Sequence, residues 1–155
     1  MNKNCVICGK PMKSYILMLA KVFPATHSRC GDDTDFLPKL AKQKIHTIRN
    51  VGKWEKRVTE INAGKAVLSL RMWTGKPYHS KMVEIARYTT VGLQHVSMSY
   101  SADMPLPTAY VDGNYVSVYD LAENDGLELP DFIEWMFPKD NVFDGVILHF
   151  TDFRY

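Results

Sequence analysis

Apolar positions along this chain fall in short runs that polar turns separate, and most of these runs predict strands. Each run is an uninterrupted or alternating stretch of apolar residues, a pattern typical of buried or half-buried strands. Phe23-Pro24 ends the first run, because proline has no amide hydrogen to donate to a sheet. The strands predicted in this way are residues 14–22, 65–73, 81–90, 93–100 and 144–153.

Two hairpins follow from the turns between these runs. The runs 81–90 and 93–100 are close enough to pair with each other across Val91-Gly92. Residues 109–116 predict a second hairpin, because Asp112-Gly113 stands between β-forming residues and this dipeptide favours a tight turn.

Helical periodicity is confined to short segments. Trp54, Val58 and Ile61 lie at i, i+4 and i+7, which makes one apolar stripe of an amphipathic helix. Gly64 follows at the position where a left-handed residue ends a helix. Three further short helices are predicted, with starts at Thr34 or Asp35, at Ser117 and at Pro130. About six strands and several short helices that do not alternate predict an α+β fold with a mixed or antiparallel barrel.

Length and composition are those of one globular domain. The chain has 155 residues, and single cores are commonest at roughly 100–150 residues. Residues 1–13 are polar and predict an N-terminal extension, whereas residues 14–155 predict a single domain. The apolar run 15–20 is far shorter than the roughly 20 residues of a membrane span, and no signal-peptide pattern surrounds it. Three cysteines agree with a reducing compartment, so we expect a cytoplasmic protein without a membrane partner.

Charge is distributed unevenly along the chain although the net charge is only +2. Residues 1–90 hold 17 Lys and Arg against 6 Asp and Glu, a net of +11, and residues 91–155 hold 2 against 11, a net of −9. Such asymmetry indicates either a basic face for a polyanion or two halves that interleave and neutralise each other.

Six segments in a characteristic order resemble one known family. They are Lys21-Val-Phe-Pro-Ala-Thr-His27, Lys44-Ile-His-Thr-Ile-Arg49, Trp54-Glu-Lys-Arg57, Ala66-Val-Leu-Ser-Leu-Arg71, Trp73-Thr-Gly-Lys-Pro-Tyr78 and Ala122-Glu-Asn-Asp-Gly-Leu127. Together they resemble the ASCH family, whose domains have a PUA-like β-barrel with flanking short helices. This resemblance implies an RNA-binding or nucleotide-binding module. One bacterial branch of the family is similar in its motif and is an amidohydrolase that removes the acetyl group from the modified nucleoside N4-acetylcytidine.

The resemblance to this branch implies three catalytic residues. Its proposed set is a Lys and a Thr three apart in Lys-x-x-Thr-Ile-Arg, which Lys44, Thr47 and Arg49 match, and a carboxylate before the last helix. Asp125 is the matching carboxylate, but the branch has Glu there, so this sequence departs by one methylene. A displacement of about 1 Å can reduce the rate by orders of magnitude, so the departure weakens the transfer of activity.

Amide hydrolysis needs a nucleophile, a base and a group that stabilises the oxyanion. Thr47 is the candidate nucleophile, and Lys44 serves either as its base when neutral or as the oxyanion stabiliser when protonated. Residues i and i+3 of a regular strand point to opposite faces, so we expect a turn between Lys44 and Thr47. His46 points away from Thr47 in an extended segment, and we interpret it as structural or exposed.

The same region supports ligand binding without catalysis. Arg49 is suited to a phosphate, and the loop that follows the strand 65–73 mixes aromatic and basic residues, which suits stacking of bases. The predicted ligand-binding residues are Arg49, Arg71, Trp73, Lys76 and Tyr78. A binding module for RNA or a nucleotide, an amidohydrolase, and a protein-interaction domain with a vestigial pocket therefore remain as alternatives.

Four residues have the spacing of a zinc site. Cys5-x-x-Cys8 is followed by His27-x-x-Cys30, and Cys and His at such spacings bind structural zinc. The alternative is that Cys5 and Cys8 belong to a loosely ordered tail. None of the predicted functions requires a cofactor.

Overall fold

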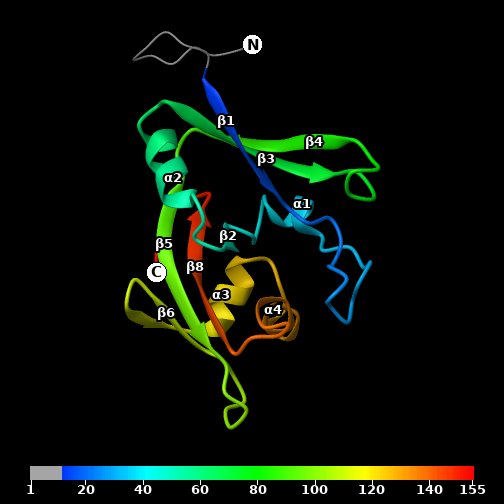
Figure 1. The fold of residues 1–155 in the computed structure, drawn as a ribbon, viewed down its shortest axis with the longest axis vertical. Helices are drawn as coiled ribbons and strands as arrows, with labels where there is room; N and C mark the ends of the chain where they lie inside the picture. The colour runs from blue at the N-terminus through cyan, green and yellow to red at the C-terminus, as the bar shows by residue number, and fades with distance from the viewer. Residues whose placement is uncertain (1–11) are drawn as a thin grey trace.

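Two β-sheets frame residues 12–155, the part of the chain that the computed structural model describes (Figure 1). The first sheet has the order β1-β3-β4, with β1 parallel to β3, and it consists of β1 (Lys13–Met18), β3 (Ala66–Trp73) and β4 (Met82–Tyr88). The second sheet has the order β2-β8-β5-β6-β7 and is antiparallel throughout, with β2 (His46–Arg49), β5 (Gly92–Ser99), β6 (Thr108–Val111), β7 (Asn114–Val116) and β8 (Val142–His149). The fold is therefore α+β. No strand pairing among these residues joins the two sheets into a closed barrel.

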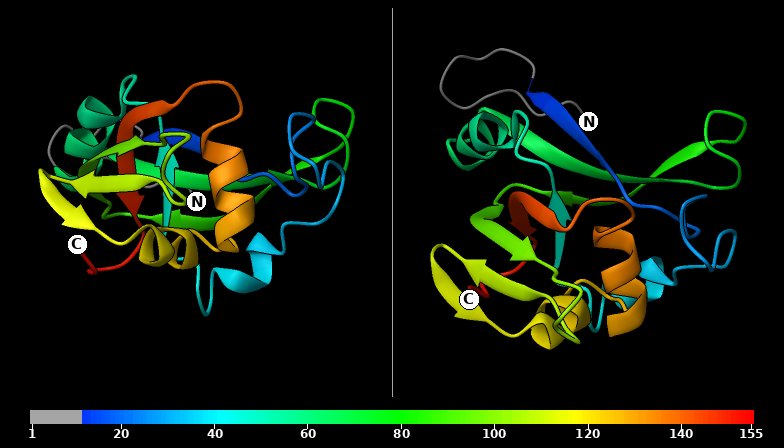
Figure 2. Two further views of the ribbon diagram at one scale, coloured as in Figure 1. Left: turned by 90° about the horizontal axis from the view of Figure 1, so that it is seen from below. Right: turned by 60° about the horizontal axis from the view of Figure 1, so that its bottom comes forward.

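Four short helices complete the fold, and they are α1 (Phe36–Lys39), α2 (Trp54–Asn62), α3 (Val118–Asn124) and α4 (Leu129–Met136). Helix α2 packs against β3 and β5, whereas α3 and α4 pack against each other beside the five-stranded sheet (Figures 1 and 2). The predicted apolar stripe of α2 is confirmed, because Trp54, Val58 and Ile61 are all buried. Gly64 has a φ of +77°, which confirms the predicted left-handed end of this helix.

The predicted strands are present, but one predicted pairing is wrong. Strands β4 and β5 do not pair with each other, since β4 pairs with β3 and β5 pairs with β6 and β8. Their short connection carries the chain from one sheet to the other instead of forming a hairpin. The Asn62 side chain fixes this crossing, because its amide exchanges two hydrogen bonds with the backbone of Val91 at 2.8 and 2.9 Å.

The turn and cap predictions are confirmed in part. The hairpin between β6 and β7 turns at Asp112 and Gly113, with φ values of +48° and +82°. Ser117 is the N-cap residue of α3 and Asp35 that of α1, but neither side chain makes a capping hydrogen bond. The predicted helix after Pro130 corresponds to α4, with proline in its first turn.

One hydrophobic core connects both sheets and the helices. Strand β3 is almost entirely buried, whereas β5 alternates between buried and exposed residues, as expected for a strand with one face toward water. No helix among residues 12–155 is long and apolar enough to cross a membrane.

The uneven charge of the sequence persists in three dimensions. Exposed cations lie on the three-stranded sheet, on α2 and in the connections beside them, and they include Lys13, Lys53, Lys56, Lys65, Lys81 and Arg87. Exposed carboxylates lie on the five-stranded sheet and near α3, and they include Asp112, Asp120, Glu123, Glu128 and Asp144. Arg29 nevertheless pairs with Asp131, and Lys44 with Asp125, so the two halves are separate on part of the surface and neutralise each other elsewhere.

The close approach of β8 to β2 yields a stability prediction at Gly145. A Cβ atom there would lie 2.3 Å from the carbonyl oxygen of Arg49 and 2.7 Å from the Phe143 ring. We expect Gly145→Ala to lower the free energy of unfolding by about 1–3 kcal/mol, because this crowding forces β8 and β2 apart. Gly75→Ala is the control, since its Cβ would meet only Ser80 at an ordinary 3.4 Å. Urea denaturation of both variants measures the difference, and equal stabilities would contradict the prediction.

Candidate functional site

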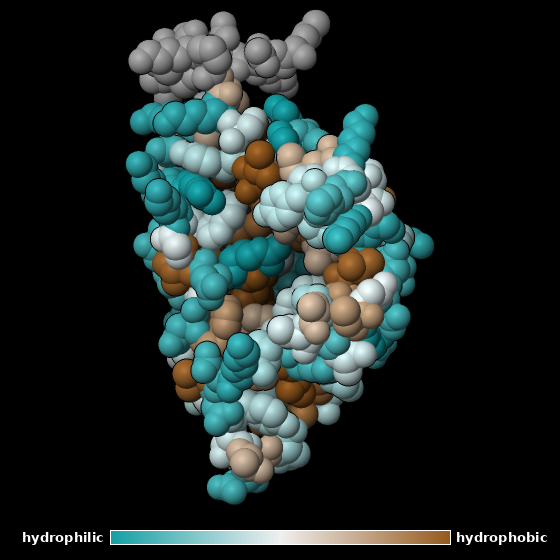
Figure 3. Space-filling model, turned by 45° about the vertical axis from the view of Figure 1, so that its right-hand side comes forward, coloured by the Kyte–Doolittle hydropathy of each residue, from teal (hydrophilic) through white to brown (hydrophobic). Residues whose placement is uncertain are grey.

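A cavity of about 670 Å³ opens between the two sheets and α4. Residues of β1, β2, β3, β8 and α4 line it, together with Asp125 and Leu127 from the segment between α3 and α4. Figure 3 shows the hollow near the middle of one face, with hydrophilic and hydrophobic side chains around its rim. The cavity combines large apolar walls with a small polar cluster, which is the usual construction of a small-molecule site.

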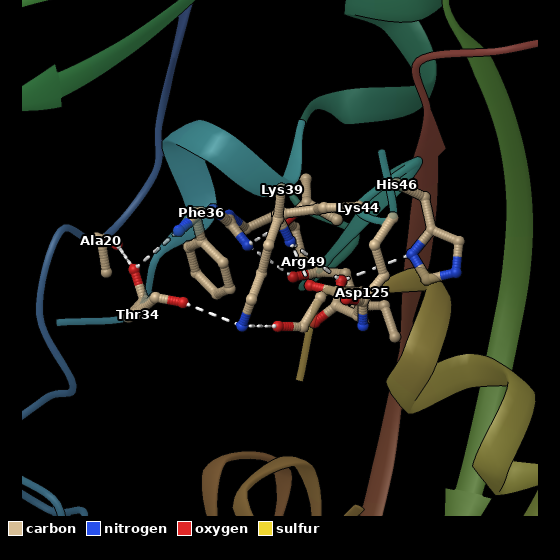
Figure 4. A network of polar contacts seen from close by, with 12 residues as sticks. Ala20, Thr34, Phe36, Lys39, Lys44, His46, Arg49 and Asp125 are labelled. Carbon is tan, nitrogen blue, oxygen red and sulfur yellow. Dashed lines mark hydrogen bonds and ion pairs between the residues drawn. The ribbon is translucent and has the colours of Figure 1, made fainter. Parts of the chain in front are cut away.

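Lys44 is the most buried charged residue of this cluster, with a side chain that is 1% exposed. Its Nζ donates to the Asp125 backbone oxygen at 2.7 Å, lies 3.3 Å from Asp125 Oδ1, and sits 4.2 Å from the centre of the Phe36 ring (Figure 4). Burial lowers the pKa of Lys44 to about 8, although the Asp125 carboxylate acts in the opposite direction. Lys44 can therefore be neutral near physiological pH, which an exposed lysine cannot.

Asp125 ends α3 and faces Lys44 because of a turn at the next residue. Gly126 has a φ of +83°, and a Cβ atom there would lie 3.1 Å from Lys44 Cβ, so the position accommodates little besides glycine. Burial alone would raise the pKa of the Asp125 carboxyl, but the charges of Lys44 and Arg49 and the contact with His46 hold that pKa below its ordinary value. Asp125 therefore stays ionised.

The two oxygens of the Asp125 carboxylate have different surroundings. Oδ1 lies 3.3 Å from Lys44 Nζ and 3.4 Å from His46 Nδ1. No hydrogen bond from residues 12–155 reaches Oδ2, and Asp125 lines the cavity. Oδ2 is thus the carboxylate oxygen that can accept a hydrogen bond from a ligand.

Arg49 joins the two sheets at the cavity wall. Its Nη1 donates to Thr47 Oγ1 at 2.7 Å and to the Ile48 carbonyl at 2.8 Å, and its Nη2 donates to the Met18 carbonyl of β1 at 2.7 Å. These acceptors are all neutral oxygens, and burial lowers the pKa of the guanidinium. Two of its five N–H groups remain for a ligand.

The cavity brings together Lys44, Thr47 and Asp125, the three predicted catalytic residues, although the predicted turn is misplaced. The turn occupies residues 40–43 and precedes Lys44, whereas β2 begins at His46. A turn between Lys44 and Thr47 is unnecessary, because Lys44 lies in irregular backbone ahead of the strand and has a long side chain.

The predicted ligand-binding residues divide into two groups. Arg49 and Trp73 line the cavity. Arg71 does not, because its Nε donates to Ser69 Oγ at 2.9 Å and that hydroxyl in turn donates to Glu84. Lys76 and Tyr78 are exposed in the loop beyond β3, where the Tyr78 ring lies 5.2 Å from that of Trp73. Lys76, Tyr78 and Arg71 therefore lie outside the cavity lining, although Pro77, between Lys76 and Tyr78 in the sequence, belongs to it.

Sequence reasoning missed His46, whose side chain is fully buried and contacts Asp125. The exposed alternative for His46 is therefore wrong. The spacing held no signal for this contact, because Lys44 lies in irregular backbone ahead of β2 and Asp125 comes from the end of α3. Phe36 and Trp135 add an aromatic wall to the cavity.

Only half of the predicted zinc set lies in the described part of the chain, since Cys5 and Cys8 fall outside it. Cys30 is exposed, and His27 is buried with both ring nitrogens engaged. His27 Nε2 donates to the Asp131 carbonyl at 3.2 Å, and Nδ1 accepts from the Arg29 amide at 3.0 Å. No group of three or more potential metal ligands occurs among residues 12–155. Zinc binding here remains a prediction, and it requires His27 to give up one hydrogen bond.

The lowered pKa of Lys44 predicts a specific dependence of stability on pH. Between the folded pKa of about 8 and the ordinary value of 10.5, the unfolded chain binds a proton that the folded chain does not. Stability contributed by this residue therefore rises with pH across that window, by up to about 3 kcal/mol.

We expect Lys44→Met to remove this rise, and Lys42→Met to keep it because Lys42 is exposed. Urea denaturation at intervals from pH 7 to pH 10.5 measures the slopes. Parallel curves for wild type and Lys44→Met would contradict the predicted shift.

No protein-family model, curated protein or solved structure matches this chain. The resemblance to the ASCH family consequently remains a prediction, and the function has to be argued from the cavity and its chemistry.

Proposed function

We propose that this protein binds a nucleoside, or a single base of an RNA, in the cavity between its two sheets, and that its two sheets are a PUA-like fold. The observation that carries the proposal is the convergence of one carboxylate, one ammonium, one guanidinium and one hydroxyl on a single wall of the cavity. These groups come from Asp125, Lys44, Arg49 and Thr47.

The polar wall is complementary to the edge of a pyrimidine. Cytosine presents an exocyclic amine as donor beside ring nitrogen and carbonyl acceptors. Asp125 Oδ2 is a free acceptor for such an amine, and the remaining N–H groups of Lys44 and Arg49 are donors for the acceptors. A wall with donors alone would favour a simple anion, so the ionised carboxylate is what favours a base.

The apolar walls are suited to the faces of a base. Phe36, Trp73 and Trp135 line the cavity, and aromatic side chains bind unstacked bases through their faces. The volume of about 670 Å³ falls within the roughly 300–1,000 Å³ that small-molecule sites span.

The distribution of charge supports RNA as the source of the bound base. Trp73 and Tyr78 stand at the end of the three-stranded sheet, and exposed cations lie on this sheet and in the connections beside it. Lys76 and Lys81 lie in the same loop region and are placed to follow a phosphate backbone. An RNA whose base enters the cavity would then bind with an affinity that falls as salt concentration rises.

Calorimetric titration tests the binding proposal. Cytidine, N4-acetylcytidine, uridine, adenosine and a short single-stranded RNA are the probes, each at low and high salt. We expect a pyrimidine nucleoside to bind, and the RNA to bind with a salt dependence that the free nucleoside lacks.

The matched variants of this titration are Asp125→Asn and Asp103→Asn. Asp125→Asn keeps the shape but removes the charged acceptor, so the affinity should fall at least about tenfold. Asp103 is exposed and does not line the cavity, so its variant should match the wild type. Absence of binding for every probe, or equal affinities for both variants, would overturn the proposal and leave the protein-interaction alternative.

Hydrolysis of an acylated base is a second candidate function, and a specific observation favours it. The pKa of Lys44 is held at about 8, so a neutral amine is available as a base on the wall of the cavity that Thr47 also lines. Thr47 Oγ1 accepts its hydrogen bond from the Arg49 cation, which stabilises developing negative charge on that oxygen. The shorter Asp125 still reaches Lys44 at 3.3 Å, so the missing methylene does not separate the pair.

In this proposal Lys44 takes the Thr47 proton as Thr47 Oγ1 attacks the acyl carbonyl carbon of N4-acetylcytidine. The bond between that carbon and N4 then breaks, and N4 leaves as the cytidine amine after receiving the proton from Lys44. Water attacks the resulting ester, which releases acetate and restores the Thr47 hydroxyl. Asp125 Oδ2 orients the N4–H group throughout.

Chromatographic detection of cytidine released from N4-acetylcytidine tests the hydrolase proposal. Thr47→Ser keeps a hydroxyl and should retain turnover, whereas Thr47→Val and Lys44→Met should lower it at least about 100-fold. Thr59→Val, on the exposed side of α2, is the control. Equal turnover in Thr47→Val and wild type would remove Thr47 from the reaction.

A further inference from the structure

A buried chain of polar contacts runs from the cavity to Tyr155. Asp125 Oδ1 lies 3.4 Å from His46 Nδ1, an ion-pair contact that falls short of hydrogen-bond geometry, and this buried Nδ1 has no hydrogen-bond partner among the described residues. His46 Nε2 lies 2.7 Å from the hydroxyl of Tyr155. Asn124 Nδ2 donates to the same hydroxyl at 2.9 Å. The His46 side chain is completely inaccessible to solvent, and Figure 4 shows it on the side of Asp125 away from Lys39 and Thr34.

The hydrogen positions in this series of contacts follow from the chemistry of Asp125 at one end and Tyr155 at the other. An ionised carboxylate only accepts hydrogen bonds, so the His46 nitrogen that faces Asp125 has to carry hydrogen. At the other end, burial raises the pKa of Tyr155, whose hydroxyl therefore keeps its proton. That hydroxyl accepts from Asn124 and has its proton to donate.

Two acceptors are available for the Tyr155 proton. His46 Nε2 is at 2.7 Å, and the Asp120 carbonyl is at 3.5 Å, which is the limit of a hydrogen bond. Donation to His46 Nε2 leaves the ring as the tautomer with hydrogen on Nδ1. This is the tautomer that the Asp125 carboxylate requires. Asp125 and Tyr155 therefore favour the same tautomer of His46.

Tyr155 is itself held firmly at the back of the site. Its backbone N–H donates to Gln94 Oε1 at 3.0 Å, and Gln94 Nε2 lies 3.4 Å from its backbone oxygen. His149 Nε2 also contacts Gln94 Oε1 at 3.0 Å, and the His149 ring lies 5.6 Å from that of His46. The hydroxyl of Tyr155 is therefore fixed relative to β5 and β8.

We propose that His46 is a positioning residue for the cavity: its Nδ1–H holds Asp125 Oδ1 against Lys44 and so directs Oδ2 to the ligand, and Tyr155 selects the His46 tautomer that does this. The role in ligand binding rests on the proposed function, whereas the tautomer does not. Without the hydrogen on Nδ1, a lone pair would face the carboxylate, and Asp125 would turn away from Lys44.

Nuclear magnetic resonance of the imidazole nitrogens tests the tautomer without any ligand. We expect wild-type His46 to have hydrogen on Nδ1 and none on Nε2. Tyr155→Phe keeps the ring and removes the proton donor, so Asp125 alone then favours hydrogen on Nδ1, and we expect a partial shift toward the tautomer with hydrogen on Nε2. Tyr119→Phe is the control, because Tyr119 is exposed on α3. Hydrogen on Nε2 in wild type, or an unchanged tautomer in Tyr155→Phe, would overturn the proposal.

Two substitutions at His46 distinguish a residue that positions Asp125 from one that only packs in the interior. The amide nitrogen of Asn occupies nearly the place of Nδ1, and that of Gln nearly the place of Nε2. His46→Asn should therefore keep an N–H group facing Asp125 and bind the nucleoside identified by titration within about threefold of wild type. His46→Gln should lose about tenfold, as for a lost hydrogen bond to a charged group. A residue that only fills space would give the opposite order, because Gln is closer to His in volume.

The outcomes distinguish the two proposals. Equal losses in both His46 variants, while wild type binds, would remove the positioning role and leave nucleoside binding intact. If wild type binds no nucleoside, the proposed function fails. Comparison of the His46 tautomer in wild type and in Tyr155→Phe then still tests whether Tyr155 selects that tautomer.

Discussion

The buried pair of Lys44 and Asp125 is the interaction on which the site depends. Removing one partner of such a pair leaves an uncompensated buried charge, which costs about 3–5 kcal/mol, so each residue requires the other. The pair also ties the segment after α1 to the end of α3, because Lys44 bonds both the backbone oxygen and the side chain of Asp125. The turn at Gly126 leaves room for Lys44, because a Cβ atom there would lie only 3.1 Å from Lys44 Cβ.

The rest of the architecture keeps this pair at the wall of an open cavity. Arg49 connects β2 to β1 and so sets the distance between the two sheets beside the cavity. Strand β8 lies between β2 and β5, and its Gly145 permits the close approach to Arg49 that a larger residue would prevent. Among residues 12–155 no strand pairing joins the two sheets, and Arg49 bridges them at the wall of the cavity.

Much of the fold was predictable from local patterns, and the failures lie where distant segments meet. The stripe of Trp54, Val58 and Ile61 and the turn at Gly113 depend on neighbours in sequence, so periodicity and turn chemistry identify them. The pairing of β4 and β5 failed because the Asn62 side chain, about 30 residues away, holds the crossing between sheets. The site residues Lys44, Thr47 and Asp125 came from the resemblance, and the contact of His46 with Asp125 could not be foreseen without knowing that α3 ends beside β2.

The central claim is that a base enters the cavity beside the Lys44 and Asp125 pair. Mapping chemical-shift changes in isotope-labelled protein on addition of cytidine or N4-acetylcytidine tests it most directly. The account predicts changes concentrated at residues 44–49, at Asp125 and at the Trp73 indole, on the wall that these residues share. Shifts confined to the exposed cations of α2 and β4, or no shifts with either nucleoside, would contradict it.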